Sequence, residues 1–160
     1  MNMRGRRAVR AALAPLVALV ALATLAALAA APAGAQPAAT NPRTLYVLHC
    51  AGCHGMDASG VPGQGVPSMR GALGHFMSLP EGRAFLLQVP GVNNAGLSDA
   101  QIALVTNWMV RQFSADTAPP GWPAYTADEV AAARARRPAD VIAARAALVA
   151  RLQQAGVGIK

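Results

Sequence analysis

Two cysteines and a histidine stand together in the sequence, as Cys50-Ala51-Gly52-Cys53-His54. A Cys-x-x-Cys-His run is typical of the site at which a c-type haem is attached. Two thiols one helical turn apart can each add across one vinyl group of a haem, and the adjacent imidazole can ligate the iron. The motif therefore predicts one covalent haem c, tethered by Cys50 and Cys53, with His54 as the proximal iron ligand.

Two other chemistries use cysteines at this spacing. A thioredoxin-like redox dithiol needs a preceding strand and a surrounding βαβ pattern. Residues 45–49 pass locally for a strand, but nothing downstream supplies the rest of that pattern. A zinc site needs four ligands at tetrahedral reach, and only His49 and His75 remain as further histidines. Haem attachment is the favoured interpretation, and the dithiol and the zinc site are its alternatives.

Four features surround the motif within residues 40–113. A short helix is expected at residues 42–50. A closing helix is expected at residues 98–113, because it starts with the capping box Ser98-Asp99-Ala100-Gln101. It continues with apolar residues at helical spacing: Ile102, Val105, Met109 and Val110. The remaining features are the segment Val66-Pro67-Ser68-Met69-Arg70-Gly71 and, before it, a glycine-rich loop: Gly55, Gly60, Gly63 and Gly65. A further helix is expected over residues 80–88, ended by Pro90-Gly91.

With these features, about half of the chain resembles the class I cytochromes c, small helical domains that wrap one haem. The resemblance implies an all-α fold: a small cytochrome c domain wrapped round one covalent haem, here with a C-terminal helical extension. It also implies that the carbonyl of Pro67 accepts a hydrogen bond from His54 and so fixes the tautomer of this ligand. Trp108 falls where the family commonly has an aromatic residue between the first and last helices.

The sixth iron ligand is where the chain departs from the family. Many members have a methionine followed by proline shortly before the last helix. The matching place here is Val89-Pro90, and valine has no lone pair to donate. We predict Met77 as the sixth ligand, because it is expected in a loop and is the freest to reach the iron. The alternatives are His75, Met69, Met109, another residue, or no protein ligand.

Residues 1–35 have the pattern of a secretory signal peptide: four arginines, an apolar run over about residues 11–31, and Ala33-Gly34-Ala35. We expect cleavage between Ala35 and Gln36 and export to a periplasm. The alternative is an uncleaved N-terminal membrane anchor, because the apolar run approaches spanning length.

Ten basic and seven acidic residues remain after the signal peptide, and their net charge of +3 is too small to indicate nucleic-acid binding.

The chain changes character after the expected cytochrome c domain, residues 36–114. A connector rich in proline is expected over residues 115–125, followed by a helical extension over residues 126–160. In the extension, Thr126-Ala127-Asp128-Glu129 predicts a capping box and a helix to about residue 136. A second helix is expected over residues 139–154. This helix pair is too short to fold alone, so it should pack on the cytochrome domain or on a partner.

Together these features predict a protein that is not an enzyme. It would transfer electrons in the periplasm through one haem c, as a soluble carrier or as the cytochrome subunit of an oxidoreductase. Its partner would be a periplasmic redox protein or dehydrogenase, and no membrane span is expected after signal cleavage. The missing methionine before Pro90 motivates the alternative, a pentacoordinate haem protein that binds or reduces CO, NO or peroxide.

Overall fold

The computed structural model describes residues 41–159, and this part of the chain is built from helices joined by loops. The predicted signal peptide and its cleavage site, residues 1–36, lie outside the described residues. Within residues 41–159, the only β pairing is an isolated bridge between Val61 and Val66. The predicted all-α class is therefore confirmed for this part of the chain. No helix in it combines the length and apolar character that crossing a membrane requires.

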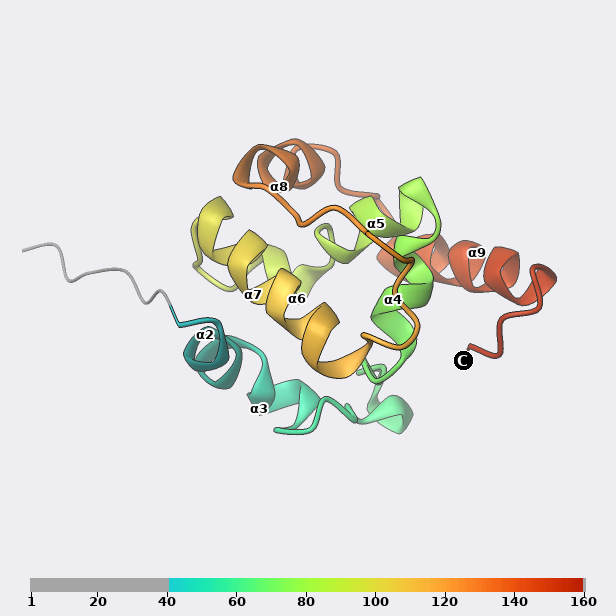
Figure 1. Ribbon diagram of the computed structural model, residues 1–160, viewed down its shortest axis with the longest axis horizontal. Coiled ribbons are helices and arrows are strands. Elements are labelled where there is room, and N and C mark those ends of the chain that lie inside the picture. Colours follow the sequence, from blue (N-terminus) through green and yellow to red (C-terminus); the bar gives the residue numbers. More distant parts are fainter. Residues whose placement is uncertain (1–40, 160) are drawn as a thin grey trace, which may run out of the picture. The chain divides into compact units, whose positions relative to one another are not determined.

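Figure 1 shows the helices in chain order. The first are α2 (Pro42–His49), α3 (Ala51–His54), the 3-10 turn η1 (Pro62–Gln64), α4 (Ala72–Met77) and α5 (Pro80–Leu86). They are followed by α6 (Pro90–Asn93), α7 (Asp99–Phe113), α8 (Ala127–Arg134) and α9 (Val141–Gln154). Helix α7 contacts α2, α4 and α8, while α9 contacts α4 and α5. The closing helix α7 is thus the element that α2, α4 and α8 share, while α9 packs on α4 and α5.

Side-chain caps explain where α2 and α7 begin. Asn41 Oδ1 accepts a hydrogen bond from the N–H of Thr44 at 3.1 Å, which satisfies one of the free amides in the first turn of α2. Ser98 and Gln101 form the predicted reciprocal capping box at the start of α7. Both helices therefore lie where the sequence predicts them.

The two helices of the extension differ in detail from the prediction. Thr126 caps α8 by accepting from the N–H of Glu129 at 3.2 Å, but the Glu129 side chain bonds to Arg83 instead of reaching back. The predicted reciprocal box is therefore only half formed. Helix α9 begins at Val141 and not at residue 139, because Asp140 is its N-cap.

Two short helices correct the expectations for the middle of the chain. Met77 is the last residue of α4 and is not in a loop. Helix α4 packs so closely on the following segment that a Cβ on Gly74 would lie 2.3 Å from the backbone nitrogen of Ala118. Pro90 opens α6 and does not end the preceding helix, which stops at Leu86. Proline fits the first turn of a helix because its missing N–H has no partner there.

The larger of two apolar clusters, the first cluster, joins residues from α2, α4, α7 and α8 and from the loops between them. Cys50 and Ala51 pack against it. The ring of Trp108 on α7 packs against that of Tyr46 on α2 in a tilted arrangement, with centroids 5.4 Å apart, so an aromatic residue does lie between the first helix and the closing helix. The buried members of the cluster are Leu45, Tyr46, Ala58, Met69, Leu73, Met77, Leu87, Leu97, Ile102, Ala103, Val105, Met109, Val110, Tyr125, Val130 and Ala133.

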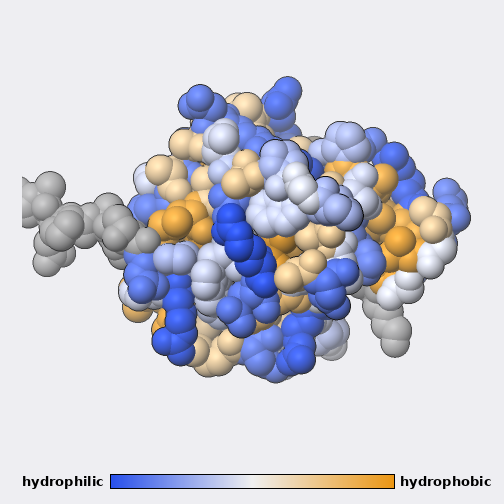
Figure 2. Space-filling model, viewed as in Figure 1, coloured by the Kyte–Doolittle hydropathy of each residue, from blue (hydrophilic) through white to orange (hydrophobic). Residues whose placement is uncertain are grey.

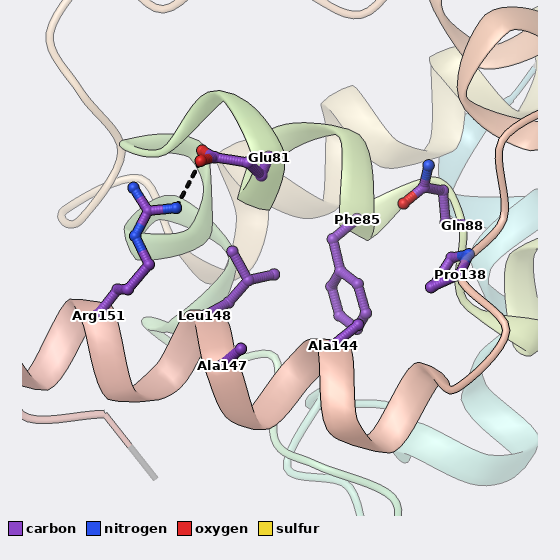
Figure 3. Close-up of a pocket in the computed structure, with 8 residues that line it drawn as sticks. All are labelled: Glu81, Phe85, Gln88, Pro138, Ala144, Ala147, Leu148 and Arg151. Atoms are coloured by element: carbon purple, nitrogen blue, oxygen red, sulfur yellow. Dashed lines mark hydrogen bonds and ion pairs between the residues drawn. The ribbon is translucent and has the colours of Figure 1, made fainter.

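The second cluster attaches α9 to α4 and α5. Its buried members are Phe76, Phe85, Leu148, Leu152 and Ile159. The rings of Phe76 and Phe85 stack with centroids 5.9 Å apart. Between α5 and α9 lies a shallow, mostly apolar cavity of about 280 Å³ (Figure 3). Both helices of the extension thus pack on the remainder of the chain, while the boundaries at residues 114 and 126 stay predictions.

The surface in the view of Figure 2 is mostly hydrophilic, with hydrophobic residues showing between the charged ones as separate patches. Two exposed apolar side chains belong to α2, those of Val47 and Leu48, and two follow the attachment motif, those of Met56 and Val61. Exposed apolar side chains that occur singly are ordinary on soluble proteins. These four are close in sequence to Cys53, which is itself exposed.

Candidate haem-attachment site

The two cysteines and His54 stand on a single helical turn. The backbone N–H groups of Cys53 and His54 both donate to the carbonyl oxygen of Cys50, at 3.2 and 3.0 Å. The N–H of Gly55 donates to Ala51 and ends α3. This turn places Cys50 and Cys53 one turn apart, with His54 directly after them, which is the arrangement that the sequence motif predicts.

The thiols are free and differ in their surroundings. Cys50 is half-buried and packs against the first cluster, whereas Cys53 is exposed. Burial raises the pKa of Cys50, and the neighbouring Cys53 raises it further. A reactive redox dithiol normally depends on a thiolate whose pKa is lowered. The environment of Cys50 therefore does not favour the dithiol alternative.

His54 is half-buried beside the loop that contains Pro67. Burial lowers the pKa of His54, and the carbonyl of Pro67 raises it by a smaller amount, so the neutral imidazole is favoured. The contact falls short of hydrogen-bond geometry, since Nδ1 of His54 is buried without a hydrogen-bond partner among the described residues. A buried nitrogen of this kind needs an acceptor, and the Pro67 carbonyl is the one beside it. This leaves Nε2 as the nitrogen that can ligate a metal.

The loop after His54 folds back and brings Pro67 to the histidine. The N–H of Gly60 donates to the carbonyl of His54 at 2.8 Å. A Cβ on Gly60 would lie 2.5 Å from the Val66 oxygen and 2.6 Å from the Pro67 oxygen, and the φ of Gly60 is +65°. Only glycine fits this close approach without strain. Two hydrogen bonds between Val61 and Val66, of 2.9 and 3.3 Å, close the loop.

Two residues that support the site were not found by sequence reasoning. The Tyr46 hydroxyl donates to the carbonyl of Gly55 at 2.5 Å and so ties α2 to the end of α3. The Ser114 hydroxyl is buried, donates to the carbonyl of Met69 at 2.8 Å and accepts from the N–H of Leu73. Tyr46 lies one helical turn before Cys50, and this spacing is a signal that could have indicated its role. Nothing in the local sequence marks Ser114.

The candidates for a sixth ligand lie in different surroundings. Met69, Met77 and Met109 are all buried in the first cluster, against which Cys50 packs. His75 is half-buried on α4. The reason given for Met77, its freedom in a loop, is wrong, because Met77 ends a helix and its side chain is only 7% exposed. All three sulfur atoms thus belong to the core that borders the attachment turn.

Val89, which the sequence resemblance aligns with the methionine of many class I cytochromes c, packs against the second cluster. Its side chain therefore belongs to the core built around α9 and not to the core beside Cys50. The 280 Å³ cavity between α5 and α9 is likewise lined by other residues, and Cys50, Cys53, His54 and Pro67 take no part in it.

The donor set fits a haem c better than it fits zinc. Two reduced thiols and a neutral imidazole on one turn suit two thioether bonds and one iron ligand. In the part of the chain that the structure describes, no group of three or more His, Cys, Asp and Glu side chains could hold a metal ion. The four-ligand zinc site thus has no support there. No protein-family model matches the chain, and neither does any curated protein.

Proposed function

We propose that this chain carries one covalent haem c and transfers electrons, as a soluble carrier or as the cytochrome subunit of an oxidoreductase. The observation that carries the proposal is the single turn α3. It follows the half-buried Cys50, contains the exposed Cys53 and ends on His54, whose buried Nδ1 lies beside the carbonyl of Pro67. A thiol pair and an oriented, neutral imidazole are the donors that this cofactor requires.

Each residue has a distinct task in this proposal. The S–H groups of Cys50 and Cys53 would add across the two vinyl groups of the haem to give two thioether bonds, and Nε2 of His54 would ligate the iron. The carbonyl of Pro67 would accept a hydrogen bond from the Nδ1–H of His54, which fixes the tautomer and raises the basicity of the ligand. When bound, the haem supplies a one-electron Fe(III)/Fe(II) couple. No side chain has to act as a base or nucleophile, so the proposed protein is not an enzyme in itself.

A sulfur ligand from the first cluster would complete the electron carrier. Met77 stays the proposed sixth ligand, with Met69, Met109 and His75 as alternatives. A thioether ligand raises the potential of a haem, whereas a second histidine lowers it. The first cluster supports methionine, because three buried thioethers share it with Cys50.

A pentacoordinate haem protein that binds CO, NO or peroxide is the second candidate function. Val89 favours it, because this valine offers no lone pair and packs against the second cluster. In this case the three methionines of the first cluster are ordinary core residues, which is the commoner role of buried methionine.

The proposed location and partners follow from the sequence. Residues 1–35 favour export to a periplasm, where the partner would be a redox protein or a dehydrogenase. The net charge of +3 after the signal peptide is compatible with docking on an acidic patch of such a partner.

The test is to produce the full chain together with a haem-attachment system and to measure covalent haem by the pyridine haemochrome spectrum. We expect one haem per chain in the wild type, and none linked covalently when Cys50 and Cys53 are both replaced by serine. His54→Gln should retain the covalent haem but change its spin state, while the matched variant His49→Gln, on the exposed end of α2, should leave the spectrum unchanged. A wild type without covalent haem would contradict the proposal.

Spectra of the reduced protein with and without CO separate the two candidate functions. A low-spin spectrum that CO does not alter indicates a strong sixth ligand and an electron carrier. A high-spin spectrum that shifts with CO indicates an open iron and the ligand-binding function. Under the first outcome, Met77→Leu should convert the low-spin spectrum to high spin.

A further inference from the structure

One wall of the first cluster has little regular structure of its own. Residues 87–97 connect α5 to α7, and the only helix between them is the four-residue α6. Leu87 and Leu97 are buried in the first cluster, and Val92 and Ala95 pack against it. Cys50 packs against the same cluster, so a group joined to Cys50 by a thioether lies at a core to which this wall contributes.

The end of α8 is bonded to this wall by one side chain from each of the two segments. Arg134 forms an ion pair with Asp99 at 2.6 Å, and its guanidinium also donates to the carbonyls of Leu97 at 3.5 Å and Asn93 at 3.4 Å. From the wall side, the amide of Gln88 donates to the carbonyls of Ala133 at 3.2 Å and Arg136 at 2.8 Å. A single guanidinium thus satisfies two carbonyls of a segment that lacks helical partners for them.

Helix α8 is itself fixed to α5 and α7. Arg83 of α5 binds Glu129 through two hydrogen bonds, of 2.6 and 2.7 Å, and lies over the ring of Tyr125 at 3.9 Å from its centroid. The side chain of Asn107 exchanges two hydrogen bonds with the backbone of Tyr125, of 3.0 and 2.8 Å. We call residues 122–136 the strap, because they cross from the end of α7 to the wall and are anchored at both ends.

We infer that the strap controls how readily an external ligand reaches the haem iron, and that Arg134 is the positioning residue through which it acts. This inference rests on the proposed function. For the wall to open, Arg134 must release its ion pair and both carbonyls, and Gln88 must release its two carbonyls at the end of α8. The anchors at Arg83 and Asn107 prevent α8 from following the wall outward. Arg134 touches neither Cys50 nor His54 in this proposal; it acts through the wall, residues 87–97.

The test compares Arg134→Gln with the matched variant Arg151→Gln in the haem-loaded full chain. Arg151 is also an arginine of the extension and pairs with a carboxylate, Glu81, but this pair is exposed and lies at the cavity between α5 and α9 (Figure 3). Two rates are measured in each variant: hydrogen exchange of the amides in residues 88–97, and association of CO with the reduced protein.

We expect Arg134→Gln to raise both rates by about tenfold, because local opening no longer breaks three bonds to a charged group. Arg151→Gln should change neither rate. Arg134→Lys keeps the charge opposite Asp99 but not the planar fork, so it should restore part of the effect. A general loss of stability would instead raise exchange throughout the core, and exchange in α2 and α7 serves to recognise it.

The inference is overturned if folded Arg134→Gln exchanges in residues 88–97 and binds CO at the wild-type rates, or if Arg151→Gln has the same effect. Faster exchange without faster CO association would also overturn it, because the wall would then not control access. Absence of covalent haem from the wild type would instead contradict the proposed function. That failure is recognised by the haemochrome spectrum before either rate is measured.

Discussion

The attachment loop, residues 50–69, and the strap, residues 122–136, are held by different kinds of bond. In the loop, backbone groups close in sequence bond to each other, as when the N–H of Gly60 donates to His54. In the strap, side chains bond to groups that are far away along the chain: Asn107 is 18 residues from Tyr125, and Gln88 is 48 residues from Arg136. Most bonds of the loop are thus local, and the hydrogen bond from Ser114 to the carbonyl of Met69 is its long-range tie, whereas these bonds of the strap form only in the assembled fold.

This difference indicates how far a change in each region should reach. A change in the loop alters the neighbours of His54 and leaves α5, α8 and α9 in place. A change in the strap loosens α5, α7 and the wall between them at once, because its bonds join all three. Measurements of the free energy of unfolding and of hydrogen exchange should therefore give different results for variants in the loop and variants in the strap, in the protein with or without a cofactor.

The largest effect is expected from Gly60→Ala in the attachment loop. The new Cβ would meet the carbonyl oxygens of Val66 and Pro67 at 2.5 and 2.6 Å, at a φ of +65°. We expect a loss of about 4 kcal/mol in the free energy of unfolding, from backbone strain and overpacking together. Urea unfolding measures it, with Gly63→Ala as the control, since a Cβ there meets nothing within 4 Å. Equal stability of the two variants would contradict the close approach.

Asn107→Ala should have the largest effect in the strap. The change leaves the backbone N–H and carbonyl of Tyr125 buried without their partners, at a cost of about 2–3 kcal/mol. Exchange should rise across residues 122–136 and stay unchanged in residues 50–69. Asn94→Ala, at an exposed position after α6, is the control. Increased exchange in the attachment loop would show that the two regions are not independent.

Glu129→Gln tests whether a partly buried ion pair of the extension contributes more to stability than an exposed one. This carboxylate binds Arg83, whose side chain is only 15% exposed, so we expect a loss of about 2 kcal/mol. Glu81→Gln removes the carboxylate from the exposed pair with Arg151, and thermal unfolding should not detect it. Equal stability of Glu129→Gln and Glu81→Gln would contradict the view that the pair of Arg83 and Glu129 holds the strap.

The smallest effect at neutral pH is expected from Tyr125→Phe, which loses one hydrogen bond to the carbonyl of Arg83. The substitution has its main effect on the stability of the protein at high pH. Burial raises the pKa of Tyr125 above its ordinary value of 10.0, so above this pH the unfolded chain ionises first. The free energy of unfolding should then fall by up to about 1.4 kcal/mol per pH unit, and less steeply in Tyr125→Phe. Urea titrations between pH 9 and 11 measure both slopes. Burial also raises the pKa of Tyr46 and, while its thiol is free, that of Cys50, and both account for slope that remains in the variant.

Sequence patterns located the elements that depend on local chemistry. Ser98 and Gln101 identify the start of α7 because both partners of the capping box lie within one turn. The Cys50–His54 spacing predicts the attachment turn because i to i+3 and i to i+4 bonds close it. No local pattern indicates helix α4, since this helix depends on the close contact of Gly74 with Thr117 and Ala118, about 43 residues away in the chain.

The candidate site divides in the same way. Cys50, Cys53 and His54 are adjacent in the chain, so the donor set and its haem chemistry are predictable from the sequence alone. The carbonyl of Pro67 reaches His54 only because the loop folds back over Gly60. Met77 was placed in a loop by its sequence neighbours and is a buried helix end in the structure. The partner of Glu129 is Arg83 and not its own helix, because a charge-assisted pair across the fold is stronger than a local cap.

The sequence by itself determined the helices α2, α5, α7, α8 and α9, the N-caps of α7 and α8, and the presence of a thiol–thiol–imidazole turn, since these depend on residues within one or two turns of each other. The tertiary structure decided which core each methionine joins, where Val89 packs and how Arg134 holds residues 88–97. Such choices depend on which distant surfaces meet, and the energies of packing and buried polar bonds that select them have no counterpart in local spacing.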